Sequence, residues 1–298
     1  IMEVGMNDSY VIVSGATGDM PQSVIEEFGI HVIPMDVRVG EQDFLYHPDE
    51  KELSCKEFYT KLSAGEESVT SQITPIVFKE VFESYLKAGK DVLYIAFSSG
   101  LSGTYNSACL IAEDLKEQYP ERKLVCIDSL CASIGEGFLV YLAGKLRKEG
   151  KSFEEVVEFV TENRRSVCHW FSVDDLLHLK RGGRLSGFEA AVGTALKIKP
   201  VLSVDREGKL TVVAKVRGTK KGMDYLKERL INDGIDTANQ TVMVGHADVP
   251  EIAEQLKQQL LDEGLVKDVI ISNVGPIIGT HVGSGMFALV FLGENYKF

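Results

Sequence analysis

The sequence FSSGLSGTYNSA at Phe97–Ala108 separates an apolar run from an amphipathic stretch, at a position where a β-strand is expected to lead into an α-helix. The first amides of a helix lack hydrogen-bond partners and carry the positive end of the helix dipole, so a carboxylate or phosphate binds there readily. Hydroxyl side chains in this stretch add further donors: Ser98, Ser99, Ser102 and Thr104. The stretch therefore predicts an anion-binding loop at a strand–helix junction of an α/β protein.

Short β-rich runs alternate with amphipathic stretches on both sides of this loop. The apolar periodicity predicts strands at Tyr10–Ser14, His31–Val39, Asp91–Phe97 and Lys123–Asp128. It predicts helices at Gln22–Phe28, Ile76–Lys87, Tyr105–Glu117 and Glu136–Lys148. Strands that alternate with helices favour a mostly parallel sheet with helices on both faces, so we expect an α/β fold for this half of the chain.

The pattern changes near Ser166. It predicts a strand at 166–173, a short helix at 174–179, a helix at 187–198 stopped by Pro200, and an antiparallel hairpin at 201–218. Further on it predicts helices at Lys220–Asn232 and Pro250–Asp262, strands at Thr241–His246 and Asp268–Asn273, and a last sheet strand at Met286–Leu292. Because 298 residues exceed what one core usually fills, we expect two domains, 1–166 with a mostly parallel sheet and 167–298 with a mixed α/β structure.

The charge of the chain is unevenly distributed. Its net charge of −12 argues against general nucleic-acid binding, because phosphate backbones would be repelled over most of the surface. Between Lys180 and Lys221, however, eleven lysines and arginines stand against three acidic residues. A basic segment on an acidic protein predicts a specific anionic partner.

Neither the apolar runs nor the cysteines indicate a membrane-spanning or secreted protein. No apolar run approaches the roughly 20 residues that a bilayer-spanning helix needs, and the N-terminus shows no basic region followed by an apolar core. The five cysteines are an odd number without the paired spacing of a zinc ribbon, which fits reduced thiols. We therefore expect a cytoplasmic protein without an integral membrane segment.

Four further motifs accompany the loop at 97–108. They read TSQITP at Thr70–Pro75, RGGRLSG at Arg181–Gly187, KVRGTKK at Lys215–Lys221 and GPIIGTHVGSG at Gly275–Gly285. In this order the motifs resemble those of the DegV family, whose members bind fatty acids. The resemblance implies a two-domain DegV-like fold with a long-chain fatty acid between the domains and no other cofactor. The chain departs from the family near its N-terminus, where Ser14-Gly15-Ala16 replaces Thr-Asp-Ser, while Thr17 and Asp19 remain.

The resemblance also implies roles for individual residues. The fatty-acid carboxylate would be held by Thr70, Ser71, Ser99, Ser102, Gly103 and His281. In the FakB subset of the family, arginines resembling Arg184 and Arg217 face a separate ATP-dependent fatty acid kinase, which phosphorylates the bound carboxylate to an acyl-phosphate. The resemblance thus implies a lipid carrier for phospholipid synthesis, without catalytic residues of its own.

Enzymatic alternatives have weaker support in the sequence. A serine-dependent lipid ester hydrolase could use Ser102, His281 and an acid such as Asp128, but SGLSGT is not a Gly-x-Ser-x-Gly elbow. A free-standing kinase would need a GxxxxGK[ST] loop, and a metal enzyme would need clustered ligands, whereas the six histidines are scattered. Taken singly, Ser102 is also typical of a helix N-cap and Arg184 of a helix C-terminus. The hydrolase remains the alternative to the carrier, and no metal site is expected.

Overall fold

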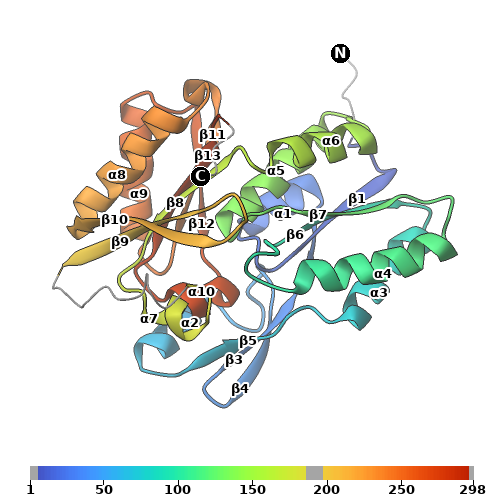
Figure 1. Cartoon of the computed structure of the whole chain (residues 1–298), viewed down its shortest axis with the longest axis horizontal. Coiled ribbons are helices and arrows are strands. Elements are labelled where there is room, and N and C mark those ends of the chain that lie inside the picture. Colours follow the sequence, from blue (N-terminus) through green and yellow to red (C-terminus); the bar gives the residue numbers. More distant parts are fainter. Residues whose placement is uncertain (1–5, 186–196, 295–298) are drawn as a thin grey trace.

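The computed structural model describes residues 6–185 and 197–294. Two large sheets lie side by side, with a small third sheet below them (Figure 1). Helices α8 (Gly218–Asp233) and α9 (Pro250–Asp262) flank one large sheet, and α3 (Pro75–Lys87) and α4 (Thr104–Gln118) flank the other. In the described ranges, no helix combines the length and apolar character needed to cross a bilayer.

The first large sheet is parallel throughout, with the strand order β2-β1-β6-β7. Its strands are β1 (Tyr10–Gly15), β2 (His31–Ile33), β6 (Asp91–Ala96) and β7 (Leu124–Asp128). The helices that accompany it are α1 (Gln22–Phe28), α3, α4, α5 (Ile134–Lys148) and α6 (Phe153–Asn163). All residues of β1 are buried, as expected for a strand covered on both faces. The parallel sheet predicted for the first half of the chain is confirmed.

The single strand predicted at His31–Val39 is wrong, because Pro34 divides it. Proline has no backbone N–H to donate to a neighbouring strand. β2 therefore ends at Ile33, and the next strand, β3 (Met35–Val39), joins the small antiparallel sheet. There β3 pairs with β4 (Gln42–Tyr46) on one side and β5 (Ser68–Thr70) on the other.

The second large sheet has the order β10-β9-β8-β13-β11-β12 and is antiparallel except between β11 and β12. Its strands are β8 (Val167–Ser172), β9 (Ile198–Val204), β10 (Leu210–Arg217), β11 (Thr241–His246), β12 (Asp268–Asn273) and β13 (Phe287–Leu292). The predicted closing strand is confirmed, and it occupies the middle of the sheet. Each large sheet takes its strands from one side of position 166, while the division into two domains stays a prediction.

The helix predicted at 187–198 lies mostly outside the described residues. Its predicted end at Pro200 is wrong, because Ile198 already begins strand β9 and Pro200 lies inside that strand. Pro200 precedes the first residue of β9 that pairs with β8, so no strand N–H is required of it there. Its carbonyl accepts hydrogen bonds from the Ser172 hydroxyl at 3.0 Å and the Val173 amide at 3.3 Å.

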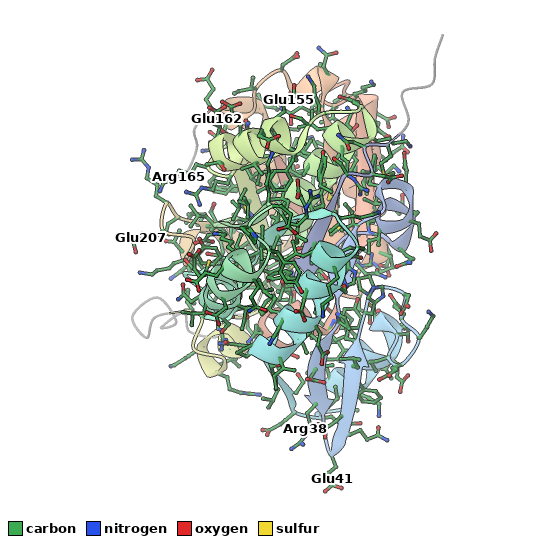
Figure 2. All side chains as sticks on the ribbon, turned by 90° about the vertical axis from the view of Figure 1, so that its right-hand side faces the viewer. Arg38, Glu41, Glu155, Glu162, Arg165 and Glu207 are labelled. Carbon is green, nitrogen blue, oxygen red and sulfur yellow. The ribbon has the colours of Figure 1, made fainter. Side chains whose placement is uncertain are left out.

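Helix α5 joins the two large sheets. It packs against β1 and β6 of the first sheet and against β8, β11 and β13 of the second, so one apolar core runs through both. A second core lies beneath α8 and α9. At the other end, α10 (Pro276–Val282) contacts α2 (Cys55–Ser63), α7 (Leu177–Arg181), β3 and β5. Figure 2 shows Arg38 and Glu41 at the tip of the small sheet, far from Glu155 and Glu162 on α6.

Candidate functional site

A cavity of about 880 Å³, its open mouth included, lies where the strand ends of the first large sheet meet the second sheet. The apolar wall consists of Met35, Phe97, Leu101, Ala132, Ile134, Trp170, Phe171, Leu179, Val204, Leu210, Ile277, Ile278, Val282, Met286, Ala288 and Val290. These residues come from both sides of position 166, so the cavity requires both halves of the chain.

Polar side chains from three distant segments of the chain meet on this cavity. The Thr70 hydroxyl lies 2.9 Å from Nε2 of His281, although 211 positions separate the two residues in the sequence. Ser71 and Ser102 also line the cavity. We call Thr70, Ser71, Ser102 and His281 the hydroxyl–histidine cluster. The structure thus brings together one residue or more from each of the motifs TSQ, SSGLSGT and GTHVGSG, although Thr70 ends strand β5 and His281 lies in helix α10.

Local packing explains how Thr70 and His281 meet. Thr70 is held by its pairing with Val37 in the small sheet, and the Ser71 amide donates to the carbonyl of Asp36 at 3.2 Å. His281 lies in the last turn of α10. This helix approaches α2 closely at Gly279, where a Cβ atom would lie 2.6 Å from the Tyr59 hydroxyl oxygen. The missing side chain therefore lets α10 seat His281 beside β5.

The second ring nitrogen of His281 fixes the direction of the hydrogen bond to Thr70. Nδ1 is buried without a hydrogen-bond partner among the described residues. A buried N–H without an acceptor is more unfavourable than a lone pair without a donor, so we assign the proton to Nε2. Nε2 then donates to the Thr70 oxygen. The hydroxyl hydrogen of Thr70 is left free to donate to a ligand in the cavity.

The electrostatic surroundings keep His281 neutral. The pKa of His281 is lowered from 6.5 to about 4, mainly by burial and also by the positive charge of Arg184 and by the neighbouring His178. Arg184 lines the cavity as well, and its charge therefore acts on the same region as the hydroxyl–histidine cluster. A neutral imidazole, hydroxyl groups and one guanidinium form a surrounding that favours a single negative charge.

The hydroxyl groups at the start of the loop 97–103 are bound elsewhere. The Ser98 hydroxyl donates to the Gly208 carbonyl at 2.7 Å, which fastens the loop to the β9–β10 turn. Ser99 does not line the cavity, because its amide and hydroxyl donate to the carboxylate of Asp128 at 3.1 and 2.5 Å. Asp128 thus supplies an internal anion to the Ser99 amide and hydroxyl, for which the sequence predicted a ligand.

The remaining predicted residues lie around the cavity. Gly103 precedes α4 and faces Gln72, since a Cβ atom would lie 3.3 Å from Gln72 Oε1. Gln72 lines the cavity, and Gly103 itself does not. Arg217 is exposed at the end of β10, immediately before α8, and does not line the cavity. Of the two arginines, only Arg184 is therefore adjacent to the hydroxyl–histidine cluster.

A buried carboxylate links the loops behind the cavity. Asp19 accepts a hydrogen bond from the Ser133 hydroxyl at 2.7 Å and from the Gly275 amide at 2.8 Å. It thereby connects the loop after β1 to the starts of α5 and α10. Burial raises the pKa of Asp19 to about 7, and the two hydrogen bonds oppose that rise.

Glu136 is a second buried carboxylate in this region. One oxygen accepts from the hydroxyls of Ser14 at 3.0 Å and Thr17 at 3.1 Å, and the other has no hydrogen-bond partner among the described residues. Burial raises its pKa well above the usual range. The sequence motifs pointed to Thr17 and Asp19 but not to Ser133, Glu136 or Gln72. An acid at the start of an otherwise apolar helix was the signal for Glu136.

The described parts of the chain contain no group of three or more His, Cys, Asp or Glu side chains that could hold a metal ion. The polar groups on the cavity are instead hydroxyls, an amide, imidazoles and a guanidinium. Such a set can orient an anionic or polar head group, while the apolar wall can accommodate a hydrocarbon.

Comparisons with known proteins place this fold in one family. The family model described as "Uncharacterised protein, DegV family" matches residues 9–294. A DegV domain-containing protein of Clostridium perfringens is 40% identical over 286 residues, which cover 96% of this chain and 98% of the relative. A structure described as "Fatty Acid Binding of a DegV family Protein from Thermus thermophilus" is 29% identical, with a TM-score of 0.85 over 96% of this chain and 100% of that one.

The same fold is found in the Streptococcus pneumoniae fatty acid kinase B3 protein loaded with linoleic acid. That structure is 23% identical and covers 96% of this chain and 100% of its own, with a TM-score of 0.82. The family match extends across both large sheets and the residues of the cavity. This chain belongs to the DegV family.

Proposed function

We propose that this protein binds a long-chain fatty acid, with the acyl chain in the apolar cavity and the carboxylate on the hydroxyl–histidine cluster. One observation carries the proposal: the hydroxyl–histidine cluster lies on a largely apolar cavity, and in this cluster the Thr70 hydroxyl is hydrogen-bonded to a neutral His281. The fatty acid binding described for the Thermus thermophilus relative supports the same ligand class.

The acyl chain would supply most of the affinity. Burying one methylene contributes about 0.8 kcal/mol, so a chain of about 14 methylenes contributes on the order of 11 kcal/mol before the entropy of binding is subtracted. A hydrogen bond to a charged group contributes about 1.5–3 kcal/mol. The cavity would thus give affinity, and Thr70, Ser71, Ser102 and His281 would orient the head group.

The same head-group site would suit an acyl-phosphate. Hydroxyl groups accept and donate hydrogen bonds, so exchanging a carboxylate for an acyl-phosphate leaves no opposite charge stranded in the pocket. We therefore propose that the protein presents the carboxylate to a separate ATP-dependent fatty acid kinase and then holds the product. Arg184 at the cavity and exposed Arg217 would contact phosphate or kinase carboxylates, since arginine pairs with both.

The contacts favour this carrier over a serine-dependent lipid ester hydrolase. A Ser–His–Asp relay needs the serine hydroxyl on the imidazole and the imidazole on the acid. Here Ser102 lies 2.9 Å from the Thr104 hydroxyl and His281 2.9 Å from the Thr70 hydroxyl. The carboxylate of Asp128 accepts from Ser99 and Leu130.

Mass spectrometry of the gently denatured protein tests the ligand. We expect a fatty acid to be released. After delipidation, added fatty acid should bind to the protein again and displace a bound fluorescent fatty-acid analogue. A protein that releases no fatty acid and binds none after delipidation would contradict the proposal. Ester hydrolysis that the purified protein performs alone and that Ser102→Ala abolishes would support the hydrolase instead.

The kinase contact needs a separate measurement. Arg184→Ala and Arg217→Ala are expected to lower phosphorylation by a purified fatty acid kinase when the protein is saturated with fatty acid. Fatty-acid affinity should stay within about twofold of wild type in Arg217→Ala, whereas Arg184→Ala should also weaken binding, because Arg184 lines the cavity. Arg165→Ala is the matched control, because Arg165 is an exposed arginine that does not line the cavity. Equal phosphorylation of wild type and both variants would remove the two arginines from the proposal.

A further inference from the structure

Three further polar side chains line the cavity. They are Thr17 in the loop after β1, Ser133 directly before α5, and His169 in β8. All three residues are buried, and none of them belongs to the hydroxyl–histidine cluster. A hydrocarbon offers no hydrogen bond to such groups, so a cavity for an unsubstituted acyl chain has no need of them. We call Thr17, Ser133 and His169 the second polar cluster.

The two hydroxyl groups of this cluster donate to buried carboxylates. Thr17 donates to Glu136 at 3.1 Å, and Ser133 donates to Asp19 at 2.7 Å. Because a hydroxyl group has a single hydrogen, Thr17 and Ser133 have only oxygen lone pairs left to offer to a ligand. Asp19 and Glu136 are therefore positioning residues, which turn the two hydroxyl groups into hydrogen-bond acceptors on the cavity wall.

His169 adds a nitrogen acceptor to the cluster. Its Nδ1 lies 3.2 Å from the Val167 carbonyl, which can only accept, so Nδ1 carries the proton and Nε2 has the lone pair. The Ala132 amide approaches Nε2 only at the long distance of 3.4 Å. Packing fixes the ring against the first turn of α5, because a Cβ atom at Gly135 would lie 1.7 Å from Nε2. All three members of the cluster can thus accept a hydrogen bond.

The backbone at Ser133 favours a role in the cavity over a role in helix capping. Ser133 stands at the N-cap position of α5 with a φ of 53° and a ψ of −128°, yet its side chain makes no capping hydrogen bond. A non-glycine residue at such a φ is strained, and strain of this kind concentrates at functional sites. The strained backbone places the hydroxyl group at the cavity wall, where Asp19 holds it.

We infer that the second polar cluster binds a hydroxyl group on the acyl chain, so that the ligands of this protein include hydroxy fatty acids. A hydroxyl group on the chain donates its hydrogen to one of the three acceptors, which a methylene cannot do. The inference rests on the proposed fatty-acid binding, in which the carboxylate occupies the hydroxyl–histidine cluster. Two clusters in one cavity would then recognise two polar groups of one ligand, and their separation would select the position of the hydroxyl group.

Titration of delipidated protein with stearic acid and with a series of monohydroxystearic acids, substituted along the middle of the chain, tests the inference. Trp170 is the single tryptophan and lines the cavity, so its fluorescence reports binding. We expect one position of the hydroxyl group to give binding at least as tight as that of stearic acid. Other positions should bind about tenfold more weakly or worse, because a buried hydroxyl group without a partner is unfavourable.

Equal affinities across the series, or weaker binding of every hydroxy acid than of stearic acid, would overturn the inference. Neither result would affect the proposed function, which fails only if stearic acid itself does not bind. The keto acid with its oxygen at the preferred carbon is the matched ligand, since a ketone accepts hydrogen bonds and donates none. Above the Asp19 pKa of about 7, it should bind about tenfold more weakly than the hydroxy acid. Equal binding of the two would also overturn the inference.

Two variants connect the selectivity to the cluster. Thr17→Val and Ser133→Ala each remove an acceptor, so the affinity for the preferred hydroxy acid, relative to stearic acid, should fall about tenfold. Thr17→Val nearly preserves the side-chain shape and leaves Glu136 its hydrogen bond from Ser14. Ser172→Ala is the matched control, because Ser172 is a buried serine that does not line the cavity. A ratio of affinities that both variants leave at the wild-type value would overturn the inference.

Discussion

The buried carboxylate of Asp19 makes the stability of this protein depend on pH. Its pKa is raised from 3.8 to about 7, because burial outweighs the hydrogen bonds from Ser133 and Gly275. Between these values the folded protein retains a proton that the unfolded chain has released, so the free energy of unfolding falls as the pH rises. One pKa unit corresponds to about 1.4 kcal/mol, so the loss approaches about 4 kcal/mol above pH 7, and about 2–3 kcal/mol of it develops between about pH 5 and 8.

Asp19→Asn keeps the size of the side chain and removes its titration. We expect its free energy of unfolding, relative to wild type, to rise by about 2–3 kcal/mol between about pH 5 and 8. Urea unfolding of delipidated protein, followed by circular dichroism across this range, measures the difference. Asp114→Asn, which removes an exposed carboxylate from α4, should follow the wild-type curve. A constant difference between wild type and Asp19→Asn across the range would refute the reasoning.

Three changes test the cavity by fatty-acid affinity after delipidation. Thr70→Val should weaken binding at least tenfold, because a hydrogen bond to a charged group contributes about 1.5–3 kcal/mol. Thr161→Val on α6 should leave the affinity unchanged. Gly182→Ala should weaken binding at least as much as Thr70→Val, since the added Cβ would lie 2.5 Å from Nδ1 of His281 and displace the ring; equal affinity would contradict the assigned place of His281. Ala288→Leu should lower the binding free energy of a long-chain fatty acid by about 2 kcal/mol, because the larger side chain displaces methylenes from the cavity. An equal loss of affinity for long and short fatty acids would contradict the place of Ala288 beside the acyl chain.

The sequence predicted the fold well wherever apolar runs were uninterrupted. Strands β1, β6 and β7 and helix α4 lie within a few residues of their predicted positions, because their apolar patterns match the faces they bury. Helices α2, α6 and α10 and strands β4 and β5 were not predicted. Two predicted elements are wrong at prolines, Pro34 and Pro200. Pro34 divides the predicted strand between two sheets, whereas Pro200 lies within strand β9. A proline is tolerated in a strand wherever the neighbouring strand needs no N–H from that position, and the sequence alone does not show which positions these are.

The candidate site was predictable as a set of motifs, but their secondary structure and their contacts were not. The motifs pointed to Thr70 and His281, yet their 2.9 Å hydrogen bond depends on how α10 packs against α2 and β5. Ser99 shows the opposite case. Its local sequence favours an anion, and the anion is Asp128 from 29 positions further along the chain. A local pattern identifies the donor, whereas only the tertiary structure decides between an internal acceptor and a ligand.

The central place of β13 has a consequence for folding. β13 pairs with β8 on one side and β11 on the other, and it is the last strand of the described chain. Until it inserts, β8–β10 and β11–β12 form two separate ribbons with unpaired edges. Contacts between positions so far apart form slowly. A nascent or truncated chain that lacks Phe287–Leu292 would therefore expose two aggregation-prone edges and have no complete wall for a lipid.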